Sequence, residues 1–217
     1  GRPDEHSPRC PALEFERTVE VDILMLSDVL QALTGKKFAN TALVISDAVI
    51  DSRQAIPASL FIAIEGERTD GHNYLATAFE NGAHLALIQH DVDASITVVD
   101  LRSPLPADFT FPAGPFALRV EDTVASLQKI AAWWRSQLNL RVIGITGSVG
   151  KSTTKELVAE VLGQRYRTVK NLGNLNNELG VPLTLLKLTQ GSECAVVEMG
   201  FYQPGDITDL CTMAKPQ

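Results

Sequence analysis

Apolar residues along the chain fall into two patterns, which together predict an α/β protein. Short runs of consecutive apolar residues indicate buried strands, whereas apolar residues spaced three or four apart indicate amphipathic helices. Strands are predicted at residues 43–50, 61–64, 85–88, 96–99, 142–145, 166–169 and 195–199. Helices are predicted at residues 26–34, 74–81, 121–138, 152–162 and 182–188. Ser27 is expected to cap the first helix and Gly35 to end it.

The order of these elements divides the chain into an extension and two α/β parts. Residues 1–20 are polar and have no apolar period, so we expect a poorly ordered extension without chemistry. Residues 21–118 form a small α/β part that includes a Pro-rich segment, 101–115, which is either an interdomain linker or a long excursion loop. Residues 119–217 open with a long helix and continue with strands of a parallel sheet.

Residues 142–162, VIGITGSVGKSTTKELVAEVL, combine a strand, a glycine-bearing turn and a helix. Gly147 and Gly150 let the backbone turn tightly and bring its N–H groups close to a ligand. Lys151 and Ser152 follow at once, where the nucleotide phosphates and a Mg²⁺ ion are held in phosphate-binding loops (P-loops). The longer GxxxxGK[ST] pattern is not met, because Ile145 stands at its first glycine. A Gly-rich turn without a ligand is the alternative, but it would not need Lys151, and we predict a nucleotide site.

The same segment predicts how its strand and helix are packed. We expect strand 142–145 to be covered on both faces, as parallel strands are. The following helix is expected to bury an apolar stripe and to end at a glycine cap, Gly163. The residues of the stripe are Leu157, Val158, Val161 and Leu162.

Two polar clusters follow predicted strands in the first part of the chain. They are Asp51-Ser52-Arg53 and residues 65–72, which read EGERTDGH. Loops after the strands of α/β folds commonly bind ligands. Asp, Ser and Gly are also what ordinary solvated turns contain, so the two interpretations are equally supported by pattern alone.

The second part contains two further candidates. Residues 171–182 combine four asparagines, two glycines and a proline, which suits a loop that hydrogen-bonds a ligand or, alternatively, a large surface turn. Glu198 lies at the C-terminal end of an apolar strand. A carboxylate at the tip of a strand next to a P-loop is where a Mg²⁺ ligand belongs, and a structural acid there would need its own partner.

Composition and charge narrow the class of protein. The 217-residue chain has 45% hydrophobic residues, a net charge of −7 and a pI near 5.1, which argues against non-specific binding to nucleic acid or anionic membranes. Trp133 and Trp134 are therefore interpreted as packing residues. Three cysteines without CxxC spacing, and the lack of a long apolar run or a signal peptide, favour a cytoplasmic protein.

The motifs together resemble the Mur ligases of peptidoglycan synthesis, most closely their D-alanyl-D-alanine-adding (MurF) type. The resemblance covers residues 26–200 and is carried, in order, by DSR at 51–53, GERTDGH at 66–72, ITGSVGKSTTKE at 145–156, NLNNELGVPLTLL at 174–186 and VVEMG at 196–200. The P-loop of this family is the short form found here. Two positions depart from the family pattern. Val149 replaces a polar loop residue, and Ala58-Ser59 replaces a common Gly-Asp turn.

The resemblance implies a fold and a set of site residues. The fold would be a small N-terminal α/β substrate domain, followed by the first part of a P-loop NTPase-like parallel-sheet domain. ATP would be bound by Gly147, Ser148, Val149, Gly150, Lys151, Ser152 and Thr153. Mg²⁺ would be held by Ser152 and Glu198, and Asn177 would contact the γ-phosphate; Lys151, Asn177 and Glu198 are the implied catalytic residues. The UDP-sugar-peptide would be bound by Ser52, Arg53, Asp70, Gly71 and His72.

The implied reaction joins D-alanyl-D-alanine to UDP-N-acetylmuramoyl-tripeptide through an acyl phosphate, at the expense of ATP. Family members continue beyond the point at which this chain stops, so we expect an N-terminal portion of a ligase that does not turn over alone, and a monomer. The alternatives are a Mur-type ligase that adds a different residue, and a non-catalytic module that binds a nucleotide or a UDP-sugar.

Overall fold

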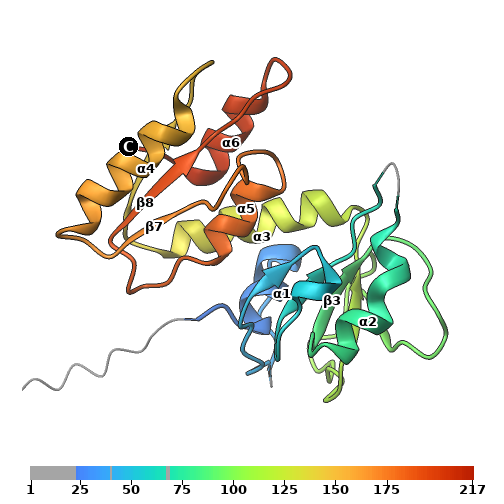
Figure 1. Ribbon diagram of the computed structural model, residues 1–217. Helices are drawn as coiled ribbons and strands as arrows, with labels where there is room; N and C mark the ends of the chain where they lie inside the picture. Colours follow the sequence, from blue (N-terminus) through green and yellow to red (C-terminus); the bar gives the residue numbers. More distant parts are fainter. Residues whose placement is uncertain (1–22, 40, 67–68) are drawn as a thin grey trace, which may run out of the picture.

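The computed structural model describes residues 23–39, 41–66 and 69–217, and it confirms the α/β class. Its named strands form two separate parallel sheets with helices against their faces (Figure 1). The predicted extension, residues 1–20 with Cys10, lies outside the described residues. Within the described part, no helix has the length and apolar character needed to cross a membrane.

The first sheet has five parallel strands in the order β1-β2-β3-β5-β4. Their bounds are β1 Ala48–Val49, β2 Leu60–Ile62, β3 Leu85–Ile88, β4 Val98–Asp100 and β5 Phe116–Arg119. Alternate residues of β2 and β3 enter two different buried clusters, because successive side chains of a strand point to opposite faces. One face packs toward α1 (Leu26–Thr34), and the other toward α2 (Leu75–Glu80).

Several predicted boundaries in this part are wrong. The predicted strand 43–50 is reduced to β1, because Val44 instead forms an isolated antiparallel bridge with Met25. Ser27 lies inside α1, whose first turn is closed by a hydrogen bond from the Met25 N–H to the Asp28 carboxylate, although Gly35 ends the helix as predicted. The predicted helix 74–81 shortens to α2 and is preceded by a 3₁₀ turn at Gly71–Tyr74.

The Pro-rich segment 101–115 is an excursion loop within the first sheet. It leaves β4 and returns as β5, which lies between β3 and β4. β5 is short and directly follows Pro115, and the sequence pattern did not predict it. In the turn before β2, Ala58 adopts a left-handed conformation with φ of 66°. That conformation costs about 1–2 kcal/mol for a residue with a Cβ atom.

The second sheet has three parallel strands in the order β6-β8-β7. The bounds are β6 Arg141–Ile145, β7 Thr168–Lys170 and β8 Cys194–Glu198. Every residue of β8 is buried, because β8 lies between the other two strands. The prediction that strand 142–145 is covered on both faces is wrong for the described residues, since Val142 is buried but Gly144 is exposed and Ile143 and Ile145 are half-buried.

The helices of this part are α4 Lys151–Gly163, α5 Gly180–Leu186 and α6 Asp206–Ala214. The predicted stripe on α4 is only partly correct. Val158 and Leu162 are half-buried, but Leu157 and Val161 are 64% and 70% exposed. The buried residues of α4 are instead Lys155 and Ala159, and Gly163 is still helical, so it does not cap the helix.

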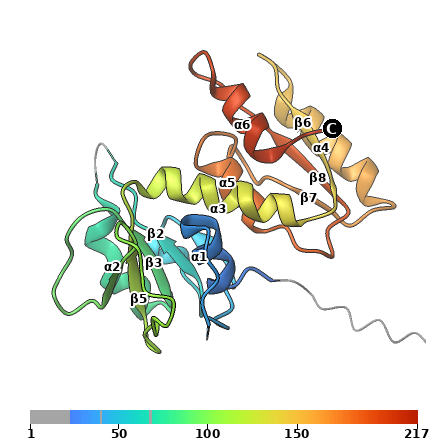
Figure 2. The same cartoon turned by 180° about the vertical axis from the view of Figure 1, so that it is seen from behind.

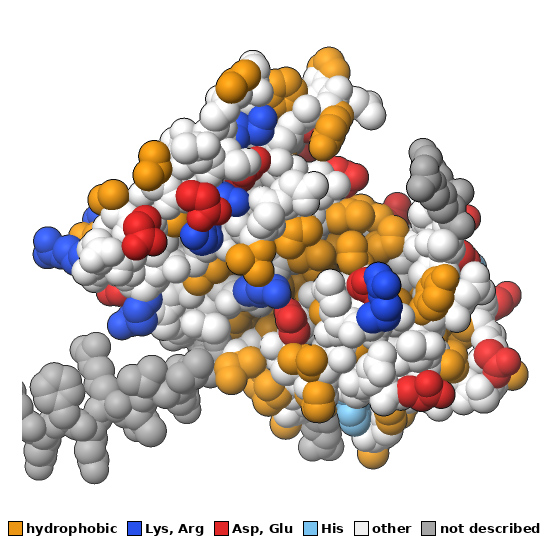
Figure 3. Space-filling model, viewed as in Figure 1, with side chains coloured by type: hydrophobic (Ala, Val, Ile, Leu, Met, Phe, Trp, Pro, Cys, Tyr) orange, Lys and Arg blue, Asp and Glu red, His pale blue; other side chains and the backbone are white. Residues whose placement is uncertain are grey.

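Helix α3 (Thr123–Gln137) joins the two halves of the molecule. Asp122 caps it by accepting a hydrogen bond from the Ala125 N–H at 2.8 Å. Both cartoon views place α3 between the two sheets, and it packs against α1, α5 and α6 (Figures 1 and 2). The space-filling view shows hydrophobic side chains gathered where the upper and lower halves meet (Figure 3).

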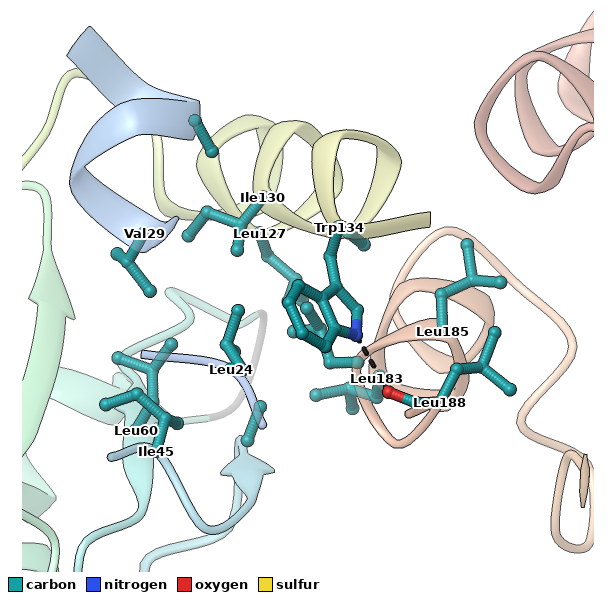
Figure 4. Close-up of a cluster of buried hydrophobic side chains, with 14 of the residues drawn as sticks. Leu24, Val29, Ile45, Leu60, Leu127, Ile130, Trp134, Leu183, Leu185 and Leu188 are labelled. Carbon is teal, nitrogen blue, oxygen red and sulfur yellow. Dashed lines mark hydrogen bonds between the residues drawn. The ribbon is translucent and has the colours of Figure 1, made fainter. Parts of the chain in front are cut away.

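One hydrophobic cluster runs through both halves (Figure 4). Leu60 and Ile45 enter it from the first half and Leu183 and Leu185 from the second, with Trp134 of α3 between them. The Trp134 indole is buried, and its Nε1–H donates to the Leu188 carbonyl at 2.8 Å. This position confirms Trp134 as a packing residue and makes it a direct link between α3 and the end of α5.

We expect Trp134→Phe to lower the free energy of unfolding by about 1–3 kcal/mol, because it leaves the buried Leu188 carbonyl without its donor. Urea denaturation measures this loss. The matched control is Trp133→Phe on the same helix, where the side chain is only half-buried, and it should lower the free energy of unfolding by less than about 1 kcal/mol. Equal losses in the two variants would contradict the role given to Trp134.

Candidate active site

The predicted nucleotide residues meet at the carboxyl edge of the second sheet. The P-loop follows β6, the asparagine-rich loop follows β7, and Glu198 ends β8. Ile145, the last residue of β6, is paired in register with Glu198. The P-loop therefore begins directly beside the Glu198 carboxylate.

The P-loop has the backbone conformation that its glycines predict. Gly147 and Gly150 have φ of 143° and 82°, and Gly150 immediately precedes α4. The first N–H groups of a helix have no partner within it and favour an anion. The Lys151 ammonium lies over the loop and donates to the Gly147 carbonyl at 2.6 Å.

Four further predicted nucleotide-binding residues are exposed, the first being Ser148 in the loop itself. Ser152 and Thr153 lie on the first turn of α4 with their side chains accessible. Val149 is 93% exposed, so this departure from the family pattern places an apolar side chain in solvent. Because a P-loop holds phosphates mainly through backbone N–H groups, Val149 leaves that function intact.

The two carboxylate oxygens of Glu198 differ, because one is hydrogen-bonded and the other only faces the Lys155 ammonium at 3.7 Å. The Glu198 side chain is 3% exposed, and Oε1 accepts a hydrogen bond from Asn176 Nδ2 at 2.8 Å. Oε2 is buried and has no hydrogen-bond partner among the described residues. A buried carboxylate oxygen is costly without a partner, and oxygen is the ligand that Mg²⁺ prefers. The Glu198 carboxylate therefore has the chemistry expected of a Mg²⁺ ligand.

The asparagine-rich loop is tied to β8 by residues that the sequence pattern did not single out. Asn171 is buried, accepts a hydrogen bond from the Glu198 N–H at 2.8 Å, and donates to the Glu198 carbonyl at 3.0 Å. The Asn176 carbonyl accepts from the Gly200 N–H at 2.7 Å. A Cβ atom at Gly200 would lie 3.0 Å from the Asn176 side chain, so a glycine allows this close approach.

Asn177, the predicted γ-phosphate contact, has a different partner in the structure. Its Oδ1 accepts a hydrogen bond from the Gly180 N–H at 2.9 Å, at the start of α5. Asn176, rather than Asn177, contacts Glu198. The asparagine content of the segment indicated a loop but could not say which amide faces which partner.

A pocket of about 300 Å³ opens beside this edge. It lies between α3 and α6 and is bordered by Asn177 and Gly200. Gln128, Tyr202 and Asp206 contribute polar groups to its wall. An organic substrate in this pocket would lie next to the loop that contacts Glu198.

Ser52 and Arg53 lie at the carboxyl edge of the first sheet, after β1. The Arg53 side chain is 84% exposed and pairs with Asp51 at 2.7 Å. Its hydrogen bond holds the pKa of the Asp51 carboxyl below the ordinary value. Ser52 is buried, and its carbonyl accepts from Asn81 Nδ2 at 2.9 Å, which anchors the turn to the end of α2.

Asp70 and His72 lie at the same edge in a network with His90. The buried His72 ring contacts the Asp70 carboxylate through Nδ1 at 2.6 Å, and its Nε2 accepts the Gln89 N–H at 3.0 Å. His90 contacts Asp70 through Nε2 at 2.9 Å and the Asp91 carbonyl through Nδ1 at 3.0 Å. The rings of His72 and His90 stack with centroids 3.6 Å apart.

The protonation states follow from these contacts. Burial raises the pKa of Asp70, but hydrogen bonds from the His72 backbone and ring and from His90 outweigh it and hold this pKa below the ordinary value. Burial lowers the pKa of His72. The pKa of His90 is raised, first by its hydrogen bond with the Asp91 carbonyl and also by Asp70. His72 is thus neutral beside an ionised Asp70.

Asp70, His72 and His90 place three ligand atoms within 4.8 Å of one another, but this arrangement does not fit a metal site. Because Nε2 of His72 accepts the Gln89 N–H, the hydrogen of the neutral ring is on Nδ1. That nitrogen donates to Asp70 and has no lone pair for a metal. Gly71 is fixed in the same network, since a Cβ atom there would lie 2.6 Å from the Ile64 backbone nitrogen. Glu67 and Arg68 of the cluster lie outside the described residues.

Two family models match the chain. The model of the Mur ligase family catalytic domain matches residues 45–110, which include the Ser52 turn and the Asp70 network. The model of the Mur ligase middle domain matches residues 145–217, which include the P-loop and Glu198.

The curated relatives are named as ligases. A UDP-N-acetylmuramoyl-tripeptide–D-alanyl-D-alanine ligase of Bacillus subtilis is 39% identical over 80% of this chain, and the ligase of that name from Escherichia coli is 32% identical over 92%. The chain spans 34% and 39% of the length of these two relatives.

Solved structures agree with the family models. MurF from Acinetobacter baumannii is 31% identical, with a TM-score of 0.68 over 91% of this chain and 40% of its own. MurF ligase from Thermotoga maritima in complex with ADP is also 31% identical, with a TM-score of 0.61 over 78% of this chain and 35% of its own. From the two matched models and these relatives, we conclude that the chain belongs to the Mur ligase family.

Proposed function

We propose that the chain is part of an ATP-dependent ligase that adds D-alanyl-D-alanine to UDP-N-acetylmuramoyl-tripeptide. The observation that carries this proposal is the buried Glu198 carboxylate at the end of β8, whose Oε2 has no hydrogen bond among the described residues. Glu198 pairs in register with Ile145, directly before the P-loop. The names of the relatives supply the substrates. The proposed ligase acts in the cytoplasm as a monomer.

The roles of the residues at the second sheet follow from their positions. Lys151 and the backbone of Gly147–Gly150 would hold the phosphates of ATP, with Thr153 and the start of α4 beside them. Ser152 and Glu198 would hold Mg²⁺, which supplies charge compensation for the phosphates when it is bound. Asn177 would line the γ-phosphate region from the loop that Asn171 fastens to β8.

The proposed chemistry has two steps. An oxygen of the tripeptide's terminal carboxylate attacks the γ-phosphorus, the bond to ADP breaks, and an acyl phosphate forms. The amine of D-alanyl-D-alanine then attacks the acyl carbon, phosphate leaves, and the amine loses a proton. Both reactants of the first step are anions, so Lys151 would lower their repulsion and stabilise the charge of the transition state.

The first sheet is proposed to bind the UDP-sugar-peptide, and residues 21–118 to form that domain, with 119–217 belonging to the ATPase domain. The Arg53 guanidinium is exposed beside its partner Asp51 and would contact an anionic substrate from there, whereas Ser52 is buried and would present its backbone. Asp70 offers a partly exposed carboxylate. Because both His72 nitrogens already have protein partners, His72 and Gly71 would act by shaping the loop.

The full-length enzyme tests the reaction. It is incubated with ATP, UDP-N-acetylmuramoyl-tripeptide and D-alanyl-D-alanine, and the UDP-linked product is weighed by mass spectrometry. We expect the mass of the tripeptide precursor plus the dipeptide less one water, with one ADP formed per product. A product formed only with a different amino compound indicates another Mur-type ligase, and binding without any product indicates a non-catalytic module.

Lys151→Ala should abolish ATP-dependent ligation by the full-length enzyme. Among the described residues the side chain donates only to the P-loop carbonyl of Gly147, so the free energy of unfolding should change by less than about 0.5 kcal/mol. Product formation and thermal unfolding measure the two effects. Retained ligation in a folded Lys151→Ala enzyme would contradict the phosphate assignment.

Arg53→Ala should raise the KM for the UDP substrate by about tenfold and leave the KM for ATP unchanged. The reason is that the exposed guanidinium lies at the carboxyl edge of the first sheet, whereas the P-loop lies at that of the second. Arg102→Ala is the matched control. Arg102 pairs with Asp100 two residues earlier, as Arg53 pairs with Asp51, but it follows β4 at the opposite end of the same sheet. Arg102→Ala should change neither KM; equal effects of the two variants would refute the Arg53 assignment.

A further inference from the structure

Lys155 is a buried lysine on α4 that has no role in the proposed nucleotide binding. Its side chain is 1% exposed and is among the largest fully buried side chains of the described residues. Burying an ammonium is costly, and lysines are almost never fully buried without partners. The groups that contact the Lys155 ammonium therefore indicate the role of its buried charge.

Two of these contacts are with the asparagine-rich loop. Lys155 Nζ donates to the Asn171 carbonyl at 3.0 Å and to the Gly173 carbonyl at 3.2 Å. The loop is thus hydrogen-bonded to α4 through Lys155 and to β8 through the Asn171 amide. Both attachments lie before Asn176, whose amide contacts Glu198.

The third buried contact is with Glu198. Lys155 Nζ lies 3.7 Å from Glu198 Oε2, close enough to compensate the charge but beyond hydrogen-bond distance. Asn176 takes Oε1 by a hydrogen bond. The carboxylate is thus compensated without losing the lone pairs of Oε2, which no described residue uses.

Lys155 also approaches Glu156, with Nζ 3.3 Å from its Oε1, but this neighbour is 52% exposed. Glu156 pairs in addition with Lys170. A surface pair of this kind contributes at most about 1 kcal/mol and does not explain a buried ammonium. Glu156 and Glu198 both pair with Lys155, so a variant of Glu156 serves as a control for the role of Glu198.

We propose that Lys155 is a positioning residue that holds Glu198 and the 171–177 loop in the geometry that accepts Mg²⁺ with the nucleotide. The proposal rests on the proposed function, because it assigns Lys155 to the metal ligand of that function. Lys155 acts through Glu198 and does not touch the nucleotide.

The test measures ADP binding to the full-length enzyme by isothermal titration calorimetry, with Mg²⁺ and with EDTA. The readout is the affinity for ADP with Mg²⁺ divided by the affinity with EDTA. Measuring this ratio requires no turnover. Lys155→Met should lower this ratio by about tenfold or more, as loss of a residue that orients a metal ligand does. Glu156→Gln, the matched control, should leave the ratio unchanged.

A double-mutant cycle shows whether Lys155 acts through Glu198. Glu198→Gln should lower the Mg²⁺ ratio, and Lys155→Met/Glu198→Gln should lower it no further. If Lys155→Met alone does not fold, the double variant, which removes both buried charges, replaces it in the comparison with Glu198→Gln.

The possible results distinguish the positioning role of Lys155 from the Mg²⁺ assignment of Glu198. A ratio that falls in Glu198→Gln but not in Lys155→Met overturns the inference alone, as does a double variant that binds much more weakly than Glu198→Gln. A ratio unchanged by Glu198→Gln overturns the Mg²⁺ assignment of the proposed function and the inference with it.

Discussion

Helix α3 is buried on two sides, and the arrangement of the molecule depends on this. One side packs on α1, and the other packs on α5 and α6. Residues of both sheets therefore belong to the same hydrophobic cluster. An ion pair at 3.4 Å between Lys187, after α5, and Asp47, before β1, ties the halves together on the surface. Because the core is shared, the carboxyl edges of the two sheets keep a defined placement relative to each other.

The second sheet edge is built around a buried negative charge. Glu198 ends a strand whose residues are all buried, and Asn171, Asn176 and Lys155 surround it. This network satisfies the backbone of Glu198 and one carboxylate oxygen by hydrogen bonds and leaves the other oxygen without one among the described residues. The first edge differs in kind, because its carboxylate, Asp70, receives hydrogen bonds on both oxygens. The two edges are thus suited to different ligands.

The sequence predicted the elements that have a strong local pattern. Strand β3 lies at the predicted residues 85–88, and α3 differs from its prediction by two residues at the start and one at the end. The P-loop glycines and Glu198 were predicted because their chemistry depends on order along the chain. Strand β5 was missed because four residues beside a Pro-rich loop carry no period. The coverage of β6 was misjudged because an apolar run does not say which elements pack on each face of a strand.

Side-chain partners were the least predictable part. Lys155 is two residues from the exposed Leu157, and nothing in the local pattern says that the lysine is the buried one of the two. Three asparagines of one loop have the same side chain, yet Asn171 contacts the Glu198 backbone, Asn176 contacts its carboxylate, and Asn177 accepts from Gly180. The first two contacts depend on Glu198, which is more than twenty residues away in sequence.

Hydrogen–deuterium exchange of the chain with each ligand tests the central claim that the two sheet edges bind different substrates. With ADP and Mg²⁺, slower exchange is predicted at residues 146–153 and 171–178. With UDP-N-acetylmuramoyl-tripeptide, it is predicted at residues 51–55 and 69–74. Protection by the nucleotide at the first sheet edge, or none at the P-loop, would contradict the account.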